Sequence, residues 1–197
     1  MQLKMYRPPH LPLPNIPPPA GFAIRAMRPG EEAAWSFCCL GEFDITQATA
    51  EGFHKKMHDQ PLSEIFFICG EDDTGAPGKP ACWGGRPVGT ATAQLLEGKP
   101  FLHYIAVHPD FRGRGLAKPL MSQVLARHAE LGRRGCFLTT DDPRLPAINS
   151  YVQLGYCPVL WSDDAAPRWH SVMRQLGLAR LEAYGDDGEP AGALELS

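Results

Sequence analysis

The stretch Phe111-Arg112-Gly113-Arg114-Gly115-Leu116-Ala117 lies between an apolar segment and an amphipathic one. The apolar segment at 101–107 predicts a strand, and apolar residues at helical spacing over 115–131 predict a helix. The two glycines allow a tight turn, and the first turn of a helix leaves backbone N–H groups without partners inside the helix. A glycine-rich turn that leads from a strand into a helix is therefore a candidate site for an anion such as a phosphate.

The spacing within this turn excludes two common phosphate-binding motifs. The turn lacks the GxxxxGK(S/T) spacing of a P-loop, and it lacks the third glycine of a dinucleotide-binding GxGxxG. A diphosphate held by turn amides and arginines, without a required metal, fits coenzyme A. The turn taken alone leaves an ordinary surface turn with exposed arginines as the alternative.

Composition limits the class of protein. The chain has 197 residues, of which 44% are hydrophobic, which is enough for one sizeable core. A net charge of -3 argues against a nucleic-acid partner, and no apolar stretch reaches the roughly 18 residues that span a membrane. The six cysteines form no CxxC pair, so we interpret them as reduced core residues of a cytoplasmic protein. Composition leaves open whether the chain is a monomer or a homodimer.

The distribution of proline and of apolar runs divides the chain into three segments. Residues 1–20, of which seven are proline, predict an extended arm, residues 21–179 a folded domain, and residues 180–197 a loosely ordered tail. We expect strands at 22–25, 64–69, 88–96, 101–107, 136–140, 156–160 and 169–173, helices at 30–40, 44–58, 115–131 and 145–154, and a long loop at 71–86 with a turn cluster at 75–78. This order predicts an α/β (α+β) fold in which a mixed, mostly antiparallel sheet of about seven strands is flanked by helices.

Two stretches resemble the signatures of one superfamily. Residues 102–121, LHYIAVHPDFRGRGLAKPLM, resemble the acetyl-CoA-binding signature Q/R-x-x-G-x-G/A of the GCN5-related N-acetyltransferases (GNAT), with Arg112, Gly115 and Ala117 at its three defined positions. Residues 147–159, AINSYVQLGYCPV, resemble the A-x-x-x-Y-x-x-x-G-F/Y segment of the same superfamily. The resemblance covers residues 21–173 and implies the GNAT fold.

The resemblance implies acetyl-CoA as the co-substrate and no metal. The backbone of Ile105, Ala106 and Val107 would bind the pantetheine arm as an added strand does, and a backbone N–H near Ile105 would polarise the thioester carbonyl. The diphosphate would be held at the turn by the residues Arg112, Gly113, Arg114, Gly115, Leu116 and Ala117.

The resemblance also assigns the two proton steps. Tyr151 occupies the position of the family's tyrosine acid, which protonates the leaving CoA sulfur, and a tyrosine that only fills the core is the alternative. Many members carry a glutamate base six residues before the position of Val107, where this chain has Phe101. His103 lies two residues on, and the segment is locally similar to serotonin N-acetyltransferase, where strand histidines relay the amine proton. A structural role for His103, with Glu97 as the base, is the alternative.

These assignments predict an N-acetyltransferase that transfers the acetyl group of acetyl-CoA to a primary amine of a small molecule, by direct attack in a ternary complex. A protein or peptide N-acetyltransferase and a non-catalytic acyl-CoA sensor are the alternatives. Trp35, Phe43 and Phe53 belong to the segment that caps the acceptor site in the superfamily, and core packing explains them equally well. His54 and His58 are one helical turn apart, but no partner at ligand spacing supports a zinc site.

Overall fold

The computed structural model describes residues 2–57, 59–70 and 85–196. The chain forms two compact units. The terminal unit comprises Met1–Pro12, Leu95–Phe101 and Gly132–Ser197, and the central unit comprises Leu13–Gln94 and Leu102–Leu131.

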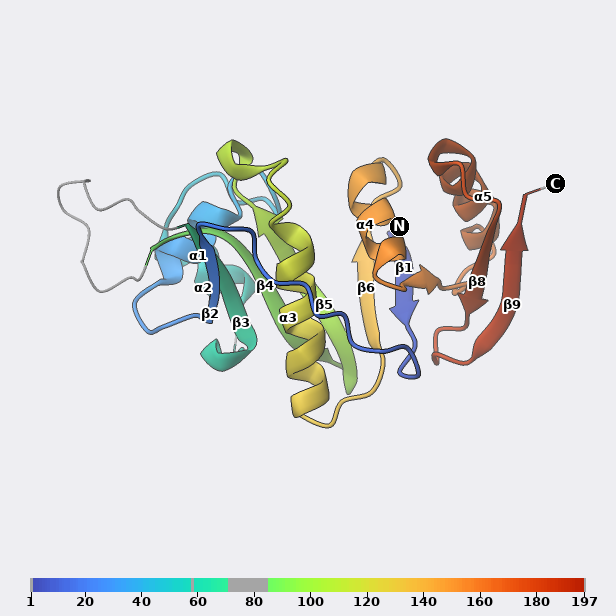
Figure 1. Ribbon diagram of the computed structural model, residues 1–197, viewed down its shortest axis with the longest axis horizontal. Helices are drawn as coiled ribbons and strands as arrows, with labels where there is room; N and C mark the ends of the chain where they lie inside the picture. Colours follow the sequence, from blue (N-terminus) through green and yellow to red (C-terminus); the bar gives the residue numbers. More distant parts are fainter. Residues whose placement is uncertain (1, 58, 71–84, 197) are drawn as a thin grey trace. The chain divides into compact units, whose positions relative to one another are not determined.

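Seven strands form one sheet in the order β2-β3-β4-β5-β6-β1-β7, and β8 and β9 form a separate pair (Figure 1). In that order the seven strands are β2 (Phe22–Ala26), β3 (Ile65–Gly70), β4 (Arg86–Leu96), β5 (Lys99–Val107), β6 (Cys136–Thr140), β1 (Leu3–Arg7) and β7 (Cys157–Pro158). β5 and β6 pair in parallel at Phe101 and Phe137, whereas β1 pairs with β6 and β7, and β3 with β2 and β4, in antiparallel registers. The predicted mixed, mostly antiparallel sheet of about seven strands is confirmed.

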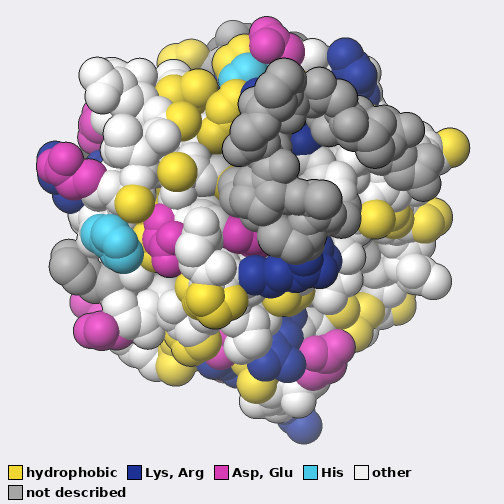
Figure 2. Space-filling view, turned by 90° about the vertical axis from the view of Figure 1, so that its left-hand side faces the viewer, with side chains coloured by type: hydrophobic (Ala, Val, Ile, Leu, Met, Phe, Trp, Pro, Cys, Tyr) yellow, Lys and Arg dark blue, Asp and Glu magenta, His cyan; other side chains and the backbone are white. Residues whose placement is uncertain are grey.

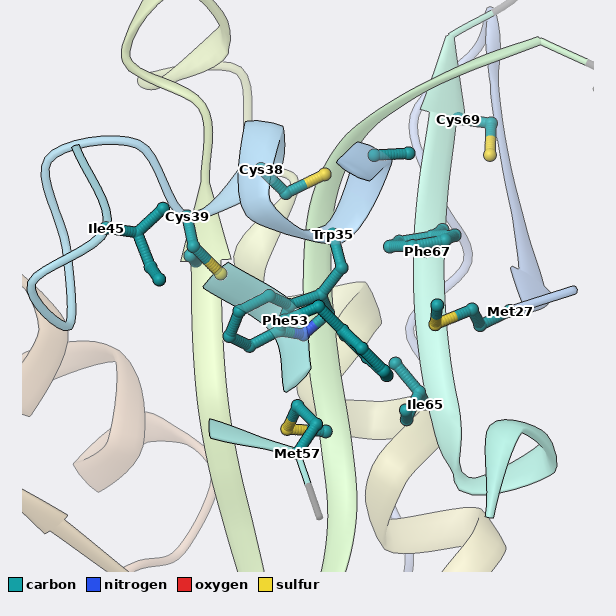
Figure 3. Close-up of a cluster of buried hydrophobic side chains, with 12 residues drawn as sticks. Met27, Trp35, Cys38, Cys39, Ile45, Phe53, Met57, Ile65, Phe67 and Cys69 are labelled. Atoms are coloured by element: carbon teal, nitrogen blue, oxygen red, sulfur yellow. The ribbon is translucent and has the colours of Figure 1, made fainter. Parts of the chain in front are cut away.

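In the central unit, helices cover both faces of the strands, which explains why β3 is apolar throughout. Ile65 and Phe67 of β3 belong to a core cluster with residues of α1 (Glu32–Cys38) and α2 (Ala50–Lys56). The side chains between them point the other way, where α3 (Ala117–Glu130) packs against β3 (Figure 1). The fully buried Trp35 lies at the centre of the cluster, with Phe53 edge-on at 5.5 Å between ring centroids (Figure 3).

In the terminal unit, aromatic rings from three strands form the core. The Tyr6 ring of β1 lies 4.5 Å from that of Phe137 in β6 and 5.3 Å from that of Tyr184 in β8, measured between centroids. A bridge between Val159 and Tyr184 links the end of β7 to β8. The remaining elements are α4 (Leu145–Gln153), α5 (Ala165–Leu176), β8 (Arg180–Tyr184) and β9 (Pro190–Glu195).

The arm expected at residues 1–20 begins instead with a strand inside the sheet. β1 pairs with β6 from Leu3 to Arg7 and with β7 on its other side. The strand ends where the prolines begin, at Pro8, because proline cannot donate a ladder hydrogen bond. The proline-rich segment that follows is extended, and the Ser122 hydroxyl of α3 donates to the Pro14 carbonyl at 2.5 Å.

Two further expectations are corrected. The strand expected at 169–173 is part of α5, because its buried residues Ala165, Trp169, Val172 and Met173 follow helical spacing. The tail expected at 180–197 forms the hairpin of β8 and β9.

The helix expected at 44–58 is shorter than predicted. It begins only at Ala50, where the Thr49 hydroxyl accepts the Gly52 N–H at 3.3 Å, and Asp44 is not its cap. The turn cluster at 75–78, Cys82 and His58 lie outside the described residues.

Among the helices that the structure describes, none combines the length and the apolar character needed to cross a membrane. In the described part of the face in Figure 2, acidic, basic and hydrophobic side chains are interspersed, so this face carries no field of a single sign.

Candidate functional site

The anion-binding turn predicted from the sequence connects β5 to α3 in the central unit. A short 3-10 helix, Pro109–Phe111, follows β5, and the chain then turns through Gly113 and Gly115 with φ of 76° and 75°. Both values lie in the left-handed region, which glycine adopts without steric cost. The glycines therefore allow α3 to begin at Ala117, directly after the turn.

Backbone N–H donors gather at this turn. The backbone amides of residues 113–117 donate no hydrogen bond to any atom of the described residues. No described side chain caps the start of α3. A Cβ atom added at Gly113 or Gly115 would meet no atom of the described residues within 4 Å, so these residues leave the space beside the glycines open. The turn thus has the donors and the room that an anion needs.

Both predicted arginines shape the loop. Arg112 Nε donates to the Val107 carbonyl at 3.0 Å, and its Nη2 donates to the Glu42 carboxylate at 2.8 Å. Arg114 Nη2 donates to the Asp110 carbonyl at 3.2 Å, and its guanidinium lies 4.9 Å from the centre of the Phe111 ring. The arginines therefore place positive charge at the turn while they fix its path.

An irregular residue precedes the predicted pantetheine segment of β5. Tyr104 has φ of 48°, a left-handed value that a bulky residue adopts only when its surroundings hold it there. Its ring is edge-on to those of Trp35 and Phe43, with centroids 5.5 and 5.2 Å away. β5 continues through Tyr104 and ends at Val107, so the segment predicted to bind pantetheine directly follows this left-handed residue.

His103 lies beside Tyr104, with their rings stacked at 3.9 Å between centroids. Its Nδ1 faces the Gln94 Oε1 of β4, and because a carbonyl oxygen only accepts, Nδ1 carries the proton and Nε2 the lone pair. Burial lowers the pKa of His103 to about 4. The imidazole is therefore neutral at pH 7, but it is a weak base.

Tyr151 lies on α4 in the terminal unit, buried, with the Tyr156 ring edge-on at 6.0 Å between centroids. A residue far away in the sequence holds the end of α4, and no sequence pattern connects the two. Arg7 of β1 donates from Nε to the Leu154 carbonyl at 2.8 Å. Its guanidinium is buried, so Arg7 is a structural support of the element that carries Tyr151.

The other candidates divide between core and surface. Trp35 and Phe53 are buried core residues, whereas Phe43 is half-buried. Glu97 is exposed in the β4–β5 turn with φ of 50°.

The described cysteines are free thiols, and burial raises the pKa of Cys38 and Cys39 well above the ordinary value. They are therefore protonated, as expected for core residues. Among the described side chains, no three His, Cys, Asp or Glu residues gather in a way that could hold a metal ion.

Comparison with known proteins gives one family. The sequence profile of the acetyltransferase (GNAT) family matches residues 41–156. A GCN5-related N-acetyltransferase from Sphaerobacter thermophilus has a TM-score of 0.65 at 23% identity, over 80% of this chain and 48% of that one. One from Kribbella flavida has a TM-score of 0.53 at 18% identity, over 80% and 54%. This chain thus spans about half the length of both.

A third structure similar to this chain is that of the NatC complex bound to Gag peptide and CoA. Its TM-score is 0.51 at 17% identity, over 68% of this chain and 82% of that one. At these identities the three structures show a shared fold.

Proposed function

Because the chain belongs to the acetyltransferase (GNAT) family, we propose that it is an acetyl-CoA-dependent N-acetyltransferase whose acceptor is a primary amine of a small molecule. The observation that carries the proposal is the row of amides at 113–117, which donate to no described atom and lie beside open space. In this proposal the amides hold the diphosphate, and Arg112 and Arg114 add charge-assisted hydrogen bonds.

Acetyl-CoA, when bound, supplies the acetyl thioester that the amine attacks. The backbone groups of Ile105, Ala106 and Val107 would hold the pantetheine arm in the manner of an added strand. These three residues directly follow Tyr104, whose left-handed backbone departs from regular strand geometry.

The proton steps are assigned to two side chains. An alkylammonium with a pKa of about 10 must lose a proton before it attacks, and Nε2 of the neutral His103 is proposed to accept it. Tyr151 is proposed to protonate the departing sulfur. The low pKa of His103 leaves its imidazole neutral at pH 7, so a lone pair is available to accept the proton, although the group is a weak base.

A peptide N-terminus is the second candidate acceptor. It is favoured by the likeness of the fold to that of the NatC complex, whose structure contains a Gag peptide together with CoA. A panel of small amines and short peptides, assayed for CoA release, would distinguish the two acceptor classes.

The test of the cofactor site is a pair of variants at Gly113, measured by calorimetric titration with acetyl-CoA. Asn and Asp have the same shape and both tolerate left-handed backbone better than other side chains, so Gly113→Asn and Gly113→Asp differ mainly in charge. We expect Gly113→Asn to bind within a few fold of the wild type. Gly113→Asp should bind about tenfold more weakly or worse, because its carboxylate repels the diphosphate.

Equal affinities of the two variants would show that the diphosphate does not lie at this turn. An absence of binding by the wild type would refute the use of acetyl-CoA itself.

A further inference from the structure

An ion pair joins the loop after α1, residues 41–45, to the turn at residues 112–117, which we call the cofactor turn. Glu42 accepts from Arg112 Nη2 at 2.8 Å, although the two residues are far apart in the sequence. The Glu42 side chain is 17% exposed and that of Arg112 is 50% exposed, so the carboxylate is partly covered while the guanidinium stays accessible to a ligand. The Val107 carbonyl fixes Arg112 from the other side through Nε.

The two contacts use only part of the guanidinium. An arginine has five N–H donors, and Glu42 and Val107 take one each. Toward the residues that the structure describes, Arg112 Nη1 donates no hydrogen bond. The guanidinium is therefore held in a fixed orientation with donors remaining for an anion, which is the arrangement that lowers the entropic cost of binding.

The loop that carries Glu42 is itself tightly fixed. Its backbone is closed by hydrogen bonds from Ile45 to Glu42 and from Gly41 to Ile45, both at 2.9 Å. Phe43 and Asp44 follow Glu42 in left-handed conformations, with φ of 52° and 61°. Such backbone costs free energy, and it persists where surrounding contacts hold it in place.

The same loop contacts β5 beside His103. The Phe43 ring is edge-on to Tyr104 at 5.2 Å, and Tyr104 stacks on His103. Adjacent residues of one strained loop thus contact the cofactor turn and the strand that carries the proposed base.

We propose that Glu42 is a positioning residue of the cofactor site, which orients Arg112 toward the diphosphate of acetyl-CoA and transmits its binding to loop 41–45. The proposal rests on the proposed function, since it requires acetyl-CoA as the ligand. It adds a residue that lies outside both sequence signatures.

The test measures the affinity of the full chain for acetyl-CoA and for S-acetylpantetheine, which has the thioester arm but no diphosphate. We expect Glu42→Gln, which keeps the shape and removes the charge, to weaken acetyl-CoA binding about tenfold and to leave S-acetylpantetheine binding unchanged. The matched control is Asp44→Asn. It removes a negative charge from the same loop, but Asp44 pairs with Lys56 and not with Arg112. It should bind acetyl-CoA within about twofold of the wild type.

A double variant tests whether Glu42 acts through Arg112. Glu42→Gln combined with Arg112→Ala should bind acetyl-CoA no more weakly than Arg112→Ala alone, because the two changes remove one interaction. Hydrogen exchange gives a readout independent of affinity. Saturating acetyl-CoA should slow exchange at amides 41–45 in the wild type but not in Glu42→Gln.

Any of the following results would overturn the proposal. Unchanged or tighter acetyl-CoA binding by Glu42→Gln would show that the carboxylate does not orient Arg112 for the diphosphate. Equal weakening toward both ligands would show a general structural role. If the wild type binds acetyl-CoA and these results appear, the positioning role alone fails, whereas a wild type that does not bind refutes the proposed function as well.

Discussion

At the scale of single residues, burial sets the chemistry of His103. Its pKa of about 4 lies below the ordinary 6.5, so between these values the unfolded chain binds a proton that the folded chain does not. The stability that His103 confers is therefore fully present above pH 6.5 and is lost as the pH falls toward 4. Below pH 4 the loss of unfolding free energy due to His103 reaches about 3 kcal/mol, which is the free energy that corresponds to this pKa shift.

A variant makes this dependence measurable. In urea unfolding between pH 4.5 and 8, the wild type should lose stability relative to His103→Gln as the pH falls below 6.5. The difference between the two isolates His103 from other titrating groups. Parallel curves across this range would show that the folded histidine titrates normally.

Gly135 shows how one missing side chain permits a close approach. Its φ is 69°, and an added Cβ would overlap the ring of Tyr6, which is packed between Phe137 and Tyr184 and cannot move aside. Gly132 has a similar φ of 68° but open space around it. The pair therefore separates backbone strain from steric overlap.

We expect Gly132→Ala to lose about 1 kcal/mol of unfolding free energy from backbone strain alone. Gly135→Ala should lose about 2–4 kcal/mol, because overpacking adds to the same strain. Chemical denaturation of both variants measures this. Equal losses would mean that the Tyr6 ring relaxes without cost.

At the scale of elements, the local sequence pattern predicted the turn between β5 and α3 and failed elsewhere. The segment from β5 to α3 has a strand pattern, two glycines and a helix pattern in sequence order, so each part is specified by its own residues. Residues 169–173 are a counterexample: a tryptophan and a valine favour a strand locally, but spacing over the longer segment 165–176 makes a helix. The five residues 169–173 are too few to show the helical period of the buried positions in α5.

The residues proposed for the site, and those that support them, divide in the same way. The turn at 113–117 could be found because all of its donors are consecutive. Glu42 and Arg7 could not, since each acts on a segment distant in the sequence, and neither a charge nor an arginine alone indicates its partner.

β1 gives a direct test of the difference between an arm and a strand. Met5 is fully buried, so Met5→Ala should lose about 2–5 kcal/mol of unfolding free energy, as other buried truncations do. Gln2→Ala, at an exposed neighbouring position, should change it by no more than about 0.5 kcal/mol. If Met5→Ala were equally neutral, residues 3–7 would behave as part of an extended arm and not as a strand of the sheet.

At the scale of the whole molecule, the two units are assembled from the chain in different ways. The central unit takes two nearby stretches, Leu13–Gln94 and Leu102–Leu131, whereas the terminal unit takes both ends of the chain and the β4–β5 turn. Hydrophobic patterns along the sequence indicate where strands lie, but they do not indicate which distant strands pair with one another. The place of β1 between β6 and β7 could therefore not be predicted.

The position of β1 between two late strands has a consequence for synthesis on the ribosome. Leu3–Arg7 are translated before the central unit, yet their partners in β6 and β7 emerge only after the whole of that unit. The nascent chain therefore carries a strand with both edges unpaired while the turn between β5 and α3 and its surroundings already have all of their residues. Slow elongation anywhere between residues 8 and 158 would prolong that exposure, because the partner strands lie at the end of this interval.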